Sequence, residues 1–192
     1  MSGRKRDDSR DSVILDAALA VLAELGYDGM TIDMVAARAG SARATVYRRW
    51  PTKADLVLDA VAQLSRGDVH LDELPDTGTL RGDMTAMILP LSDEEQQVRV
   101  QAVAGLLALA KGDDRLAGAA TGVGIGPWIE VNRILIQRAI DRGEFPPGDV
   151  ATLAEVIPTM VVSRAAQRLP ITREWSIALI DGVIIPALRG GG

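Results

Sequence analysis

Apolar residues recur three and four positions apart along most of the chain, the spacing of one face of an α-helix. In residues 11–25 this face ends at Gly26 and consists of Ile14, Ala17, Ala18, Val21, Leu22 and Leu25. The same spacing predicts further helices at residues 53–66, 79–89, 93–111, 126–142, 149–168 and 173–189, with a shorter one near 114–120. Strict alternation is absent, so the pattern predicts an all-α fold of about nine helices.

Residues 31–53 predict two short helices around a glycine turn. The apolar face of the first helix consists of Ile32, Val35, Ala36 and Ala39. Thr31 can cap the start of this helix with its hydroxyl. Gly40 can adopt the positive φ that ends a helix, and Ser41 can cap the helix that follows.

The second helix of the pair is basic. Val46 and Trp50 lie four positions apart and are expected to face inward, which leaves five polar side chains outside and on the flanks: Arg43, Thr45, Tyr47, Arg48 and Arg49. Between Ser41 and Lys53 there are four basic residues and no acidic one, although the chain has a formal net charge of -5. Guanidinium and hydroxyl groups suit phosphate oxygens and guanine edges. We interpret the segment as a DNA-reading helix; the alternative is a solvated face of an all-helical protein-interaction module.

Charge is divided unevenly along the chain. Residues 1–66 contain ten Lys and Arg against nine Asp and Glu, whereas residues 67–192 contain eleven against seventeen. An acidic body directs the basic end toward DNA, an effect that salt weakens. The predicted organisation is a disordered basic arm at residues 1–9, a DNA-binding domain at 10–66 whose fourth helix is a connector, and a helical ligand-binding and dimerisation domain at 67–192.

The segment from Arg10 to Leu64 resembles the N-terminal domain of TetR-family transcriptional repressors. The matching parts are AARAG, the T-V-Y of the second helix, and the aromatic-x-x-Lys pattern of Trp50 to Lys53. Arg49 stands where a histidine is common in the family. The resemblance implies that the DNA contacts come from Thr31, Arg43, Ala44, Thr45, Tyr47, Arg48, Arg49 and Lys53. Among these we expect Tyr47 and Lys53 at phosphates, and Arg43, Thr45 and Arg48 at base edges.

A second segment, from Trp128 to Glu144, contains an R-A-x-x-R-G-E signature and resembles the C-terminal ligand and dimer domain of one branch of the family. The resemblance implies a homodimer through the last two long helices, which would present two reading helices to a palindromic operator. Both helices are apolar around most of their circumference, as burial on two sides requires. The residues assigned to the interface are Val156, Met160, Trp175, Leu179 and Val183. The alternative is a central helix in a monomeric bundle, and Pro158 is expected to kink its helix.

The family resemblance also implies a small-molecule effector that releases the protein from DNA. With one Phe and two Tyr in the chain, the binding cavity should be mainly aliphatic and should favour an apolar ligand. Residues proposed to line it are Met84, Met87, Ile88, Leu106, Leu109 and Trp128, although a place in the plain core is the favoured interpretation for each of them. The sequence names neither the effector nor the operator, and transcriptional activation stays open.

Little in the chain predicts catalysis, a cofactor or a metal. The chain has no cysteine, and its one histidine, His70, lies in a polar linker where it is expected to be solvated. The GVGIGP segment at residues 122–127 lacks the G-x-G-x-x-G spacing of a nucleotide-binding turn. We therefore expect a cytoplasmic regulator that is not an enzyme, needs no cofactor and has no membrane partner.

Overall fold

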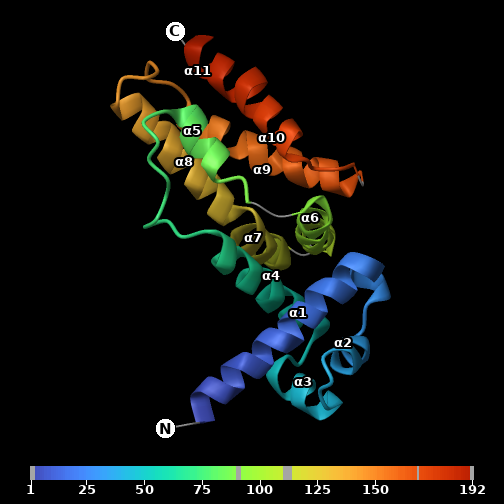
Figure 1. Ribbon diagram of the computed structural model, residues 1–192. Coiled ribbons are helices and arrows are strands. Elements are labelled where there is room, and N and C mark those ends of the chain that lie inside the picture. Colours follow the sequence, from blue (N-terminus) through green and yellow to red (C-terminus); the bar gives the residue numbers. More distant parts are fainter. Residues whose placement is uncertain (1–2, 90–91, 110–113, 168, 191–192) are drawn as a thin grey trace. The chain divides into compact units, whose positions relative to one another are not determined.

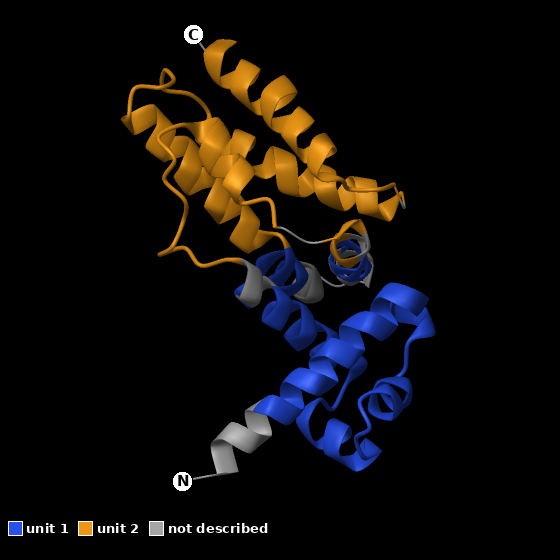
Figure 2. Cartoon of the chain, in the orientation of Figure 1, with its two compact units in different colours: residues 1–67, 98–124 blue, residues 68–97, 125–192 orange. Residues whose placement is uncertain are grey.

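The computed structural model describes residues 3–89, 92–109, 114–167 and 169–190. Within these ranges every regular element is a helix and there is no strand (Figure 1). The predicted all-α fold is confirmed. Two compact units make up the chain: unit 1 comprises residues 1–67 and 98–124, and unit 2 comprises residues 68–97 and 125–192 (Figure 2).

Unit 1 differs from the predicted N-terminal domain because it includes part of α6 (Asp93–Leu109) and the whole of α7 (Asp114–Gly124). The buried residues Ala102 and Ala120 belong to its core. A Cβ atom placed on Gly105 would lie 3.4 Å from a methyl carbon of Leu22, which shows that the backbone of α6 packs closely against the Leu22 side chain. Helical periodicity predicts that α6 and α7 have an apolar face, but not which unit that face packs against.

The remaining helices of unit 1 are α1 (Gly3–Gly29), α2 (Ile32–Arg38), α3 (Arg43–Arg49) and α4 (Lys53–Asp68). The helix α1 begins at Gly3, so it includes residues 3–9, which the sequence analysis assigns to a basic arm. The segment contains no proline, and helix propagation adds one hydrogen bond per residue once the buried turns have nucleated it. Gly26 breaks α1 with a φ of 69°, which is where the sequence predicts the helix end.

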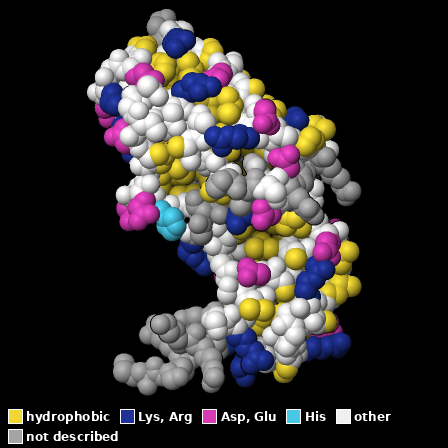
Figure 3. Space-filling model, in the orientation of Figure 1, with side chains coloured by type: hydrophobic (Ala, Val, Ile, Leu, Met, Phe, Trp, Pro, Cys, Tyr) yellow, Lys and Arg dark blue, Asp and Glu magenta, His cyan; other side chains and the backbone are white. Residues whose placement is uncertain are grey.

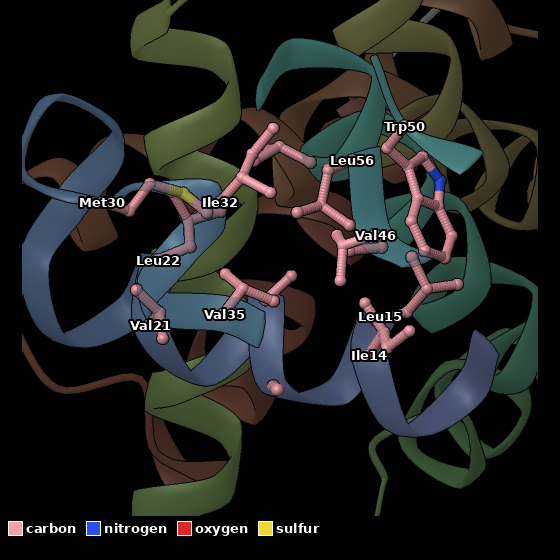
Figure 4. Close-up of a cluster of buried hydrophobic side chains, with 14 of the residues drawn as sticks. Ile14, Leu15, Val21, Leu22, Met30, Ile32, Val35, Val46, Trp50 and Leu56 are labelled. Carbon is pink, nitrogen blue, oxygen red and sulfur yellow. The ribbon is translucent and has the colours of Figure 1, made fainter. Parts of the chain in front are cut away.

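The core of unit 1 lies between its first four helices. Figure 4 shows side chains from each of them converging, among them Ile14 of α1, Val35 of α2, Val46 of α3 and Leu56 of α4. All four are fully buried. Burying apolar surface stabilises a fold by about 25 cal/mol per Å². Packing into this shared cluster therefore stabilises α2 and α3, which are too short to be stable alone.

Unit 2 consists of α5 (Leu80–Ala86), α8 (Gly126–Asp141), α9 (Val150–Ala166), α10 (Arg173–Leu179), a π-helical turn η1 (Ile180–Ile184) and α11 (Ile185–Gly190). The last three run continuously, so the single helix predicted at 173–189 contains one wider turn. Pro158 is buried within α9, which continues through it. Buried side chains from α5, α8, the loop after α8 and the C-terminal helices form one core: Leu80, Met84, Val131, Leu135, Ile136, Ala139, Phe145, Ile180, Ile184, Ile185 and Leu188.

The R-A-x-x-R-G-E signature attaches α5, and the chain just before it, to the end of α8. Arg142 donates to the fully buried carboxylate of Asp83 through both terminal nitrogens, at 3.1 and 3.2 Å. Asp83 also accepts hydrogen bonds from the backbone N–H and the hydroxyl of Thr77, at 2.6 and 2.8 Å. Glu144 accepts from the backbone N–H of Leu80 at 2.8 Å, and Gly143 supplies the turn with a φ of 78°. The signature therefore stabilises the packing of unit 2 through hydrogen bonds and an ion pair.

Candidate nucleic-acid interface

A tight turn joins α2 to α3. Thr31 caps α2, because its Oγ1 accepts a hydrogen bond from the Met34 N–H at 3.2 Å, as the sequence predicts. Gly40 adopts a φ of 59°, and the N–H of Ser41 donates to the carbonyl oxygen of Ala36 at 2.9 Å. These backbone bonds end α2 and fix the direction in which the chain enters α3.

The predicted cap of α3 is wrong. The residue at the N-cap position is Ala42, which makes no side-chain capping bond, and not Ser41. The turn places Ser41 one residue earlier, where its N–H closes the end of α2. Capping preference alone cannot locate a helix start to within one residue when a glycine turn separates two short helices.

One side of α3 is anchored in unit 1. Val46 is fully buried and Trp50, directly after the helix, is 5% exposed, so both face inward as predicted. The indole Nε1–H of Trp50 donates to the Oδ2 of Asp59 in α4 at 2.8 Å. Apolar packing and one directional hydrogen bond therefore fix the rotation of α3 about its axis.

The opposite side of α3 is exposed and basic. Arg43, Ala44, Tyr47 and Arg48 are exposed, and these positions (i, i+1, i+4 and i+5) form one continuous face, whereas Thr45 is half-buried at its edge. The side chain of Arg43 is 73% exposed, and Tyr47 is 47% exposed. Figure 3 shows Lys and Arg side chains at the surface of unit 1 over α3. We call Arg43, Ala44, Tyr47 and Arg48 the outer face of α3.

The three arginines of α3 have different surroundings. In Arg43, Nη1 lies 2.8 Å from Oδ2 of Asp33 in α2. The Arg48 side chain has no hydrogen-bond or ion-pair partner in the described part of the chain. Arg49 forms an ion pair with Asp11 of α1 and is only 16% exposed. The structure thus places Arg43 and Arg48 on the surface and uses Arg49 to attach α3 to α1.

Lys53 also has internal partners. Its Nζ donates to the carbonyl oxygens of Tyr27 at 2.6 Å and Met30 at 3.1 Å, and it lies 4.0 Å from the centroid of the Tyr27 ring. Two of its three N–H donors are therefore used inside unit 1. Sequence spacing identified Lys53 as part of a family pattern but not its partners, because they lie more than twenty positions away in the chain.

Comparison with known proteins decides the family. The family described as "Bacterial regulatory proteins, tetR family" matches residues 14–60, and the "Tetracyclin repressor-like, C-terminal domain" matches residues 74–183. The chain belongs to the TetR family. It is a DNA-binding transcriptional regulator.

Relatives match this TetR-family chain over nearly its whole length. An uncharacterised HTH-type transcriptional regulator of Mycobacterium tuberculosis is 32% identical over 181 residues, 93% of this chain and 88% of the relative. The DNA-binding transcriptional repressor TetR of Mycobacteroides abscessus is 30% identical over 188 residues, 97% of each chain. A crystal structure from Rhodococcus sp., assigned to the TetR family, has a TM-score of 0.76 and 20% identity over 94% of this chain and 99% of that chain, which shows a shared fold.

The residues predicted to bind an effector are distributed between core and partly buried positions. Met84 is 4% exposed in the core of unit 2, with Met87 and Ile88 packed against it. Trp128 in α8 is half-buried. Leu106 and Leu109 lie on α6, but their side chains are outside the described residues. Among the described residues, no group of three His, Asp or Glu side chains is placed to hold a metal ion, and no helix there is long and apolar enough to cross a membrane.

The residues predicted at a dimer interface differ in their exposure within one protomer. Met160 on α9 is 41% exposed and Val183 in η1 is 38% exposed, while Val156 and Trp175 are half-buried. Leu179 is only 7% exposed within the single chain, and its assignment to the interface stays a prediction. A helix that is apolar on all sides does not reveal from sequence which residues face inward.

Proposed function

We propose that this regulator is a homodimeric repressor that occupies a palindromic operator through the outer face of α3. The observation that supports this proposal most directly is the division of α3 into a buried side, fixed by Val46 and Trp50, and an exposed side that carries Arg43 and Arg48. A fixed helix with an exposed basic face can enter a major groove in one orientation, which sequence-specific reading requires.

Within this proposal the exposed side chains have different tasks. Arg48 and Arg43 contact base edges because their forks suit guanine O6 and N7, and Thr45 lies at the edge of the same face. Tyr47 and Thr31 contact phosphates through their hydroxyl groups. Arg49 and Lys53 hold α3 in place through their internal contacts, a role different from the DNA contacts that the family pattern implies.

Dimerisation is proposed through the exposed apolar residues of unit 2. Met160, Val183 and the half-buried Trp175 are apolar side chains on or beside the last two long helices, and such residues favour burial against a second copy. Twofold symmetry would place two reading helices in successive major grooves, about 34 to 36 Å apart. A small apolar effector that favours a different separation would release the operator. We expect such a regulator in the cytoplasm, because its operator DNA lies there.

The test is selection of random-sequence duplexes by the purified full-length protein at two salt concentrations, followed by sequencing. A palindrome that stays enriched at the higher salt supports the proposal, because specific contacts lose less affinity than phosphate contacts alone. Enrichment of a single non-repeated half-site would contradict the dimer. Binding that vanishes equally for all sequences would contradict sequence-specific reading and would favour a protein-interaction surface.

A further inference from the structure

The ion pair between Asp33 and Arg43 joins the two helices of the reading element. Oδ2 of Asp33 lies 2.8 Å from Nη1 of Arg43, and the two side chains are 39% and 73% exposed. Asp33 lies in the first turn of α2, between the buried Ile32 and the buried Val35, so its backbone position is fixed by the core. Arg43, in contrast, is the first residue of α3 and extends into solvent.

We propose that Asp33 is a specificity-determining residue, which orients Arg43 toward a guanine edge and keeps it from the phosphate backbone. The proposal rests on the proposed function, since it names how one reading residue of α3 obtains its preference. Asp33 is a positioning residue and acts through Arg43.

The physical basis is competition for one guanidinium group. A free arginine on a DNA-binding surface can satisfy its donors with phosphate oxygens, which gives affinity without sequence information. A carboxylate beside Arg43 repels phosphate oxygens and already accepts at Nη1. The remaining donors on Nε and Nη2 form a free planar edge, and a planar pair of donors matches O6 and N7 of guanine.

Arg48 provides the contrast within the same helix. It is exposed and has no partner in the part of the chain that the structure describes, so nothing there restrains it from a phosphate. Arg43, which is held by Asp33, should therefore contribute mainly to the preference for one base pair. Arg48, which is not held, should contribute more to the affinity for DNA of any sequence. Asp33 weakens attraction to DNA in general and strengthens the preference for one base pair.

The test uses the full-length protein, the selected operator and a scrambled duplex of equal length, with affinities measured at several salt concentrations. Asp33→Asn removes the charge with little change in shape. We expect the affinity for scrambled DNA to rise severalfold while the affinity for the operator stays the same, so that the ratio of the two falls severalfold. The slope of log affinity against log salt should become steeper by about one phosphate contact.

Two further variants separate the proposal from simpler effects. Asp28→Asn removes an exposed acidic charge of unit 1 and should leave the ratio unchanged. Arg43→Lys keeps the charge and loses the planar fork, so it should lower the ratio by itself and leave Asp33→Asn with no further effect. This variant leaves α2 unaltered, so it reports on the proposal even if Asp33→Asn reduces the folded fraction.

The outcomes are distinguishable. An equal rise for both duplexes in Asp33→Asn, matched by Asp28→Asn, would reduce Asp33 to a general charge effect and overturn the proposal. A lower melting temperature with an unchanged ratio in Asp33→Asn would assign Asp33 to helix stability and overturn the proposal. An unchanged ratio in Arg43→Lys would also overturn the proposal. If the wild type itself does not discriminate between the duplexes, the proposed function fails, and this inference fails with it.

Discussion

The ammonium of Lys53 donates a hydrogen bond to the carbonyl oxygen of Tyr27 at 2.6 Å and lies over the ring of the same residue. Tyr27 lies near the end of α1 and Lys53 is the first residue of α4, so one side chain joins the two helices that support α3. Burial, and then the charges of Asp28 and Asp55, raise the pKa of the Tyr27 phenol. The phenol is therefore neutral near pH 7, and the ammonium is attracted to the face of its ring by the aromatic quadrupole.

Replacing Lys53 by Met should lower the stability of the protein and weaken binding to all DNA sequences alike. Two backbone carbonyl groups lose a charged donor, which costs about 1 to 3 kcal/mol. Urea unfolding measures the first effect, and binding to operator and scrambled duplexes measures the second. A loss of operator affinity with no change in stability would show instead that Lys53 contacts DNA directly.

Arg48→Ala should leave the unfolding free energy unchanged, because the side chain is exposed and has no partner in the described chain. Operator affinity should fall by about 1 to 3 kcal/mol, with relaxed preference at one base pair. Selection of random duplexes by the variant measures the change in preference. A uniform loss at all sequences would place Arg48 at a phosphate.

Arg142→Gln should destabilise unit 2, because it leaves the fully buried carboxylate of Asp83 without its cation. Breaking one partner of a buried pair costs about 3 to 5 kcal/mol. The matched control is Arg133→Gln, since Arg133 pairs with Glu130 on the surface of α8 and such pairs contribute about 1 kcal/mol or less. Equal losses in the two variants, measured by urea unfolding, would contradict the structural role of the signature.

Acid should destabilise the protein through Asp83. Burial acts to raise the pKa of this carboxyl, but hydrogen bonds from Thr77 and the guanidinium of Arg142 outweigh it and hold the pKa below its usual range. The stabilisation is therefore complete above the unfolded pKa, about 3.9, and is lost as the pH falls through the lower folded value. Urea unfolding between pH 6 and 3 should show this loss in the wild type, and Asp83→Asn should show a flatter profile.

Val183→Glu should weaken the proposed dimer without unfolding the protomer, since Val183 is 38% exposed. Light scattering should report a lower mass, and operator affinity should fall with it. Leu179→Ala, at 7% exposure on the same continuous helix, should instead lower the unfolding free energy by about 2 to 5 kcal/mol. A Val183→Glu variant that stays dimeric and binds the operator normally would place the interface elsewhere.

Helical periodicity predicted most of the elements because their packing depends on local spacing. The inward direction of Val46 and Trp50 follows from their separation by four positions, and the structure confirms it. The turn at Gly40 follows from the need for a positive φ.

Long-range contacts could not be read in the same way. The ion pair between Arg49 and Asp11 joins residues 38 positions apart, and no local sequence pattern predicts it. The placement of α6 and α7 in unit 1 depends on small residues such as Ala102 and Gly105, which a hydrophobic pattern treats as weak signals. Side chains that attach α3 to its neighbours are therefore indistinguishable, in sequence, from those of its outer face.

The measurement that tests the central claim most directly compares the wild type with a variant that carries Arg43→Ala, Tyr47→Ala and Arg48→Ala together. These substitutions remove the polar side chains of the outer face of α3 and leave its buried side intact. We predict an unchanged melting temperature, retained dimer mass and loss of preference for the selected operator over a scrambled duplex. A folded variant that still prefers the operator would contradict the assignment of DNA reading to this face.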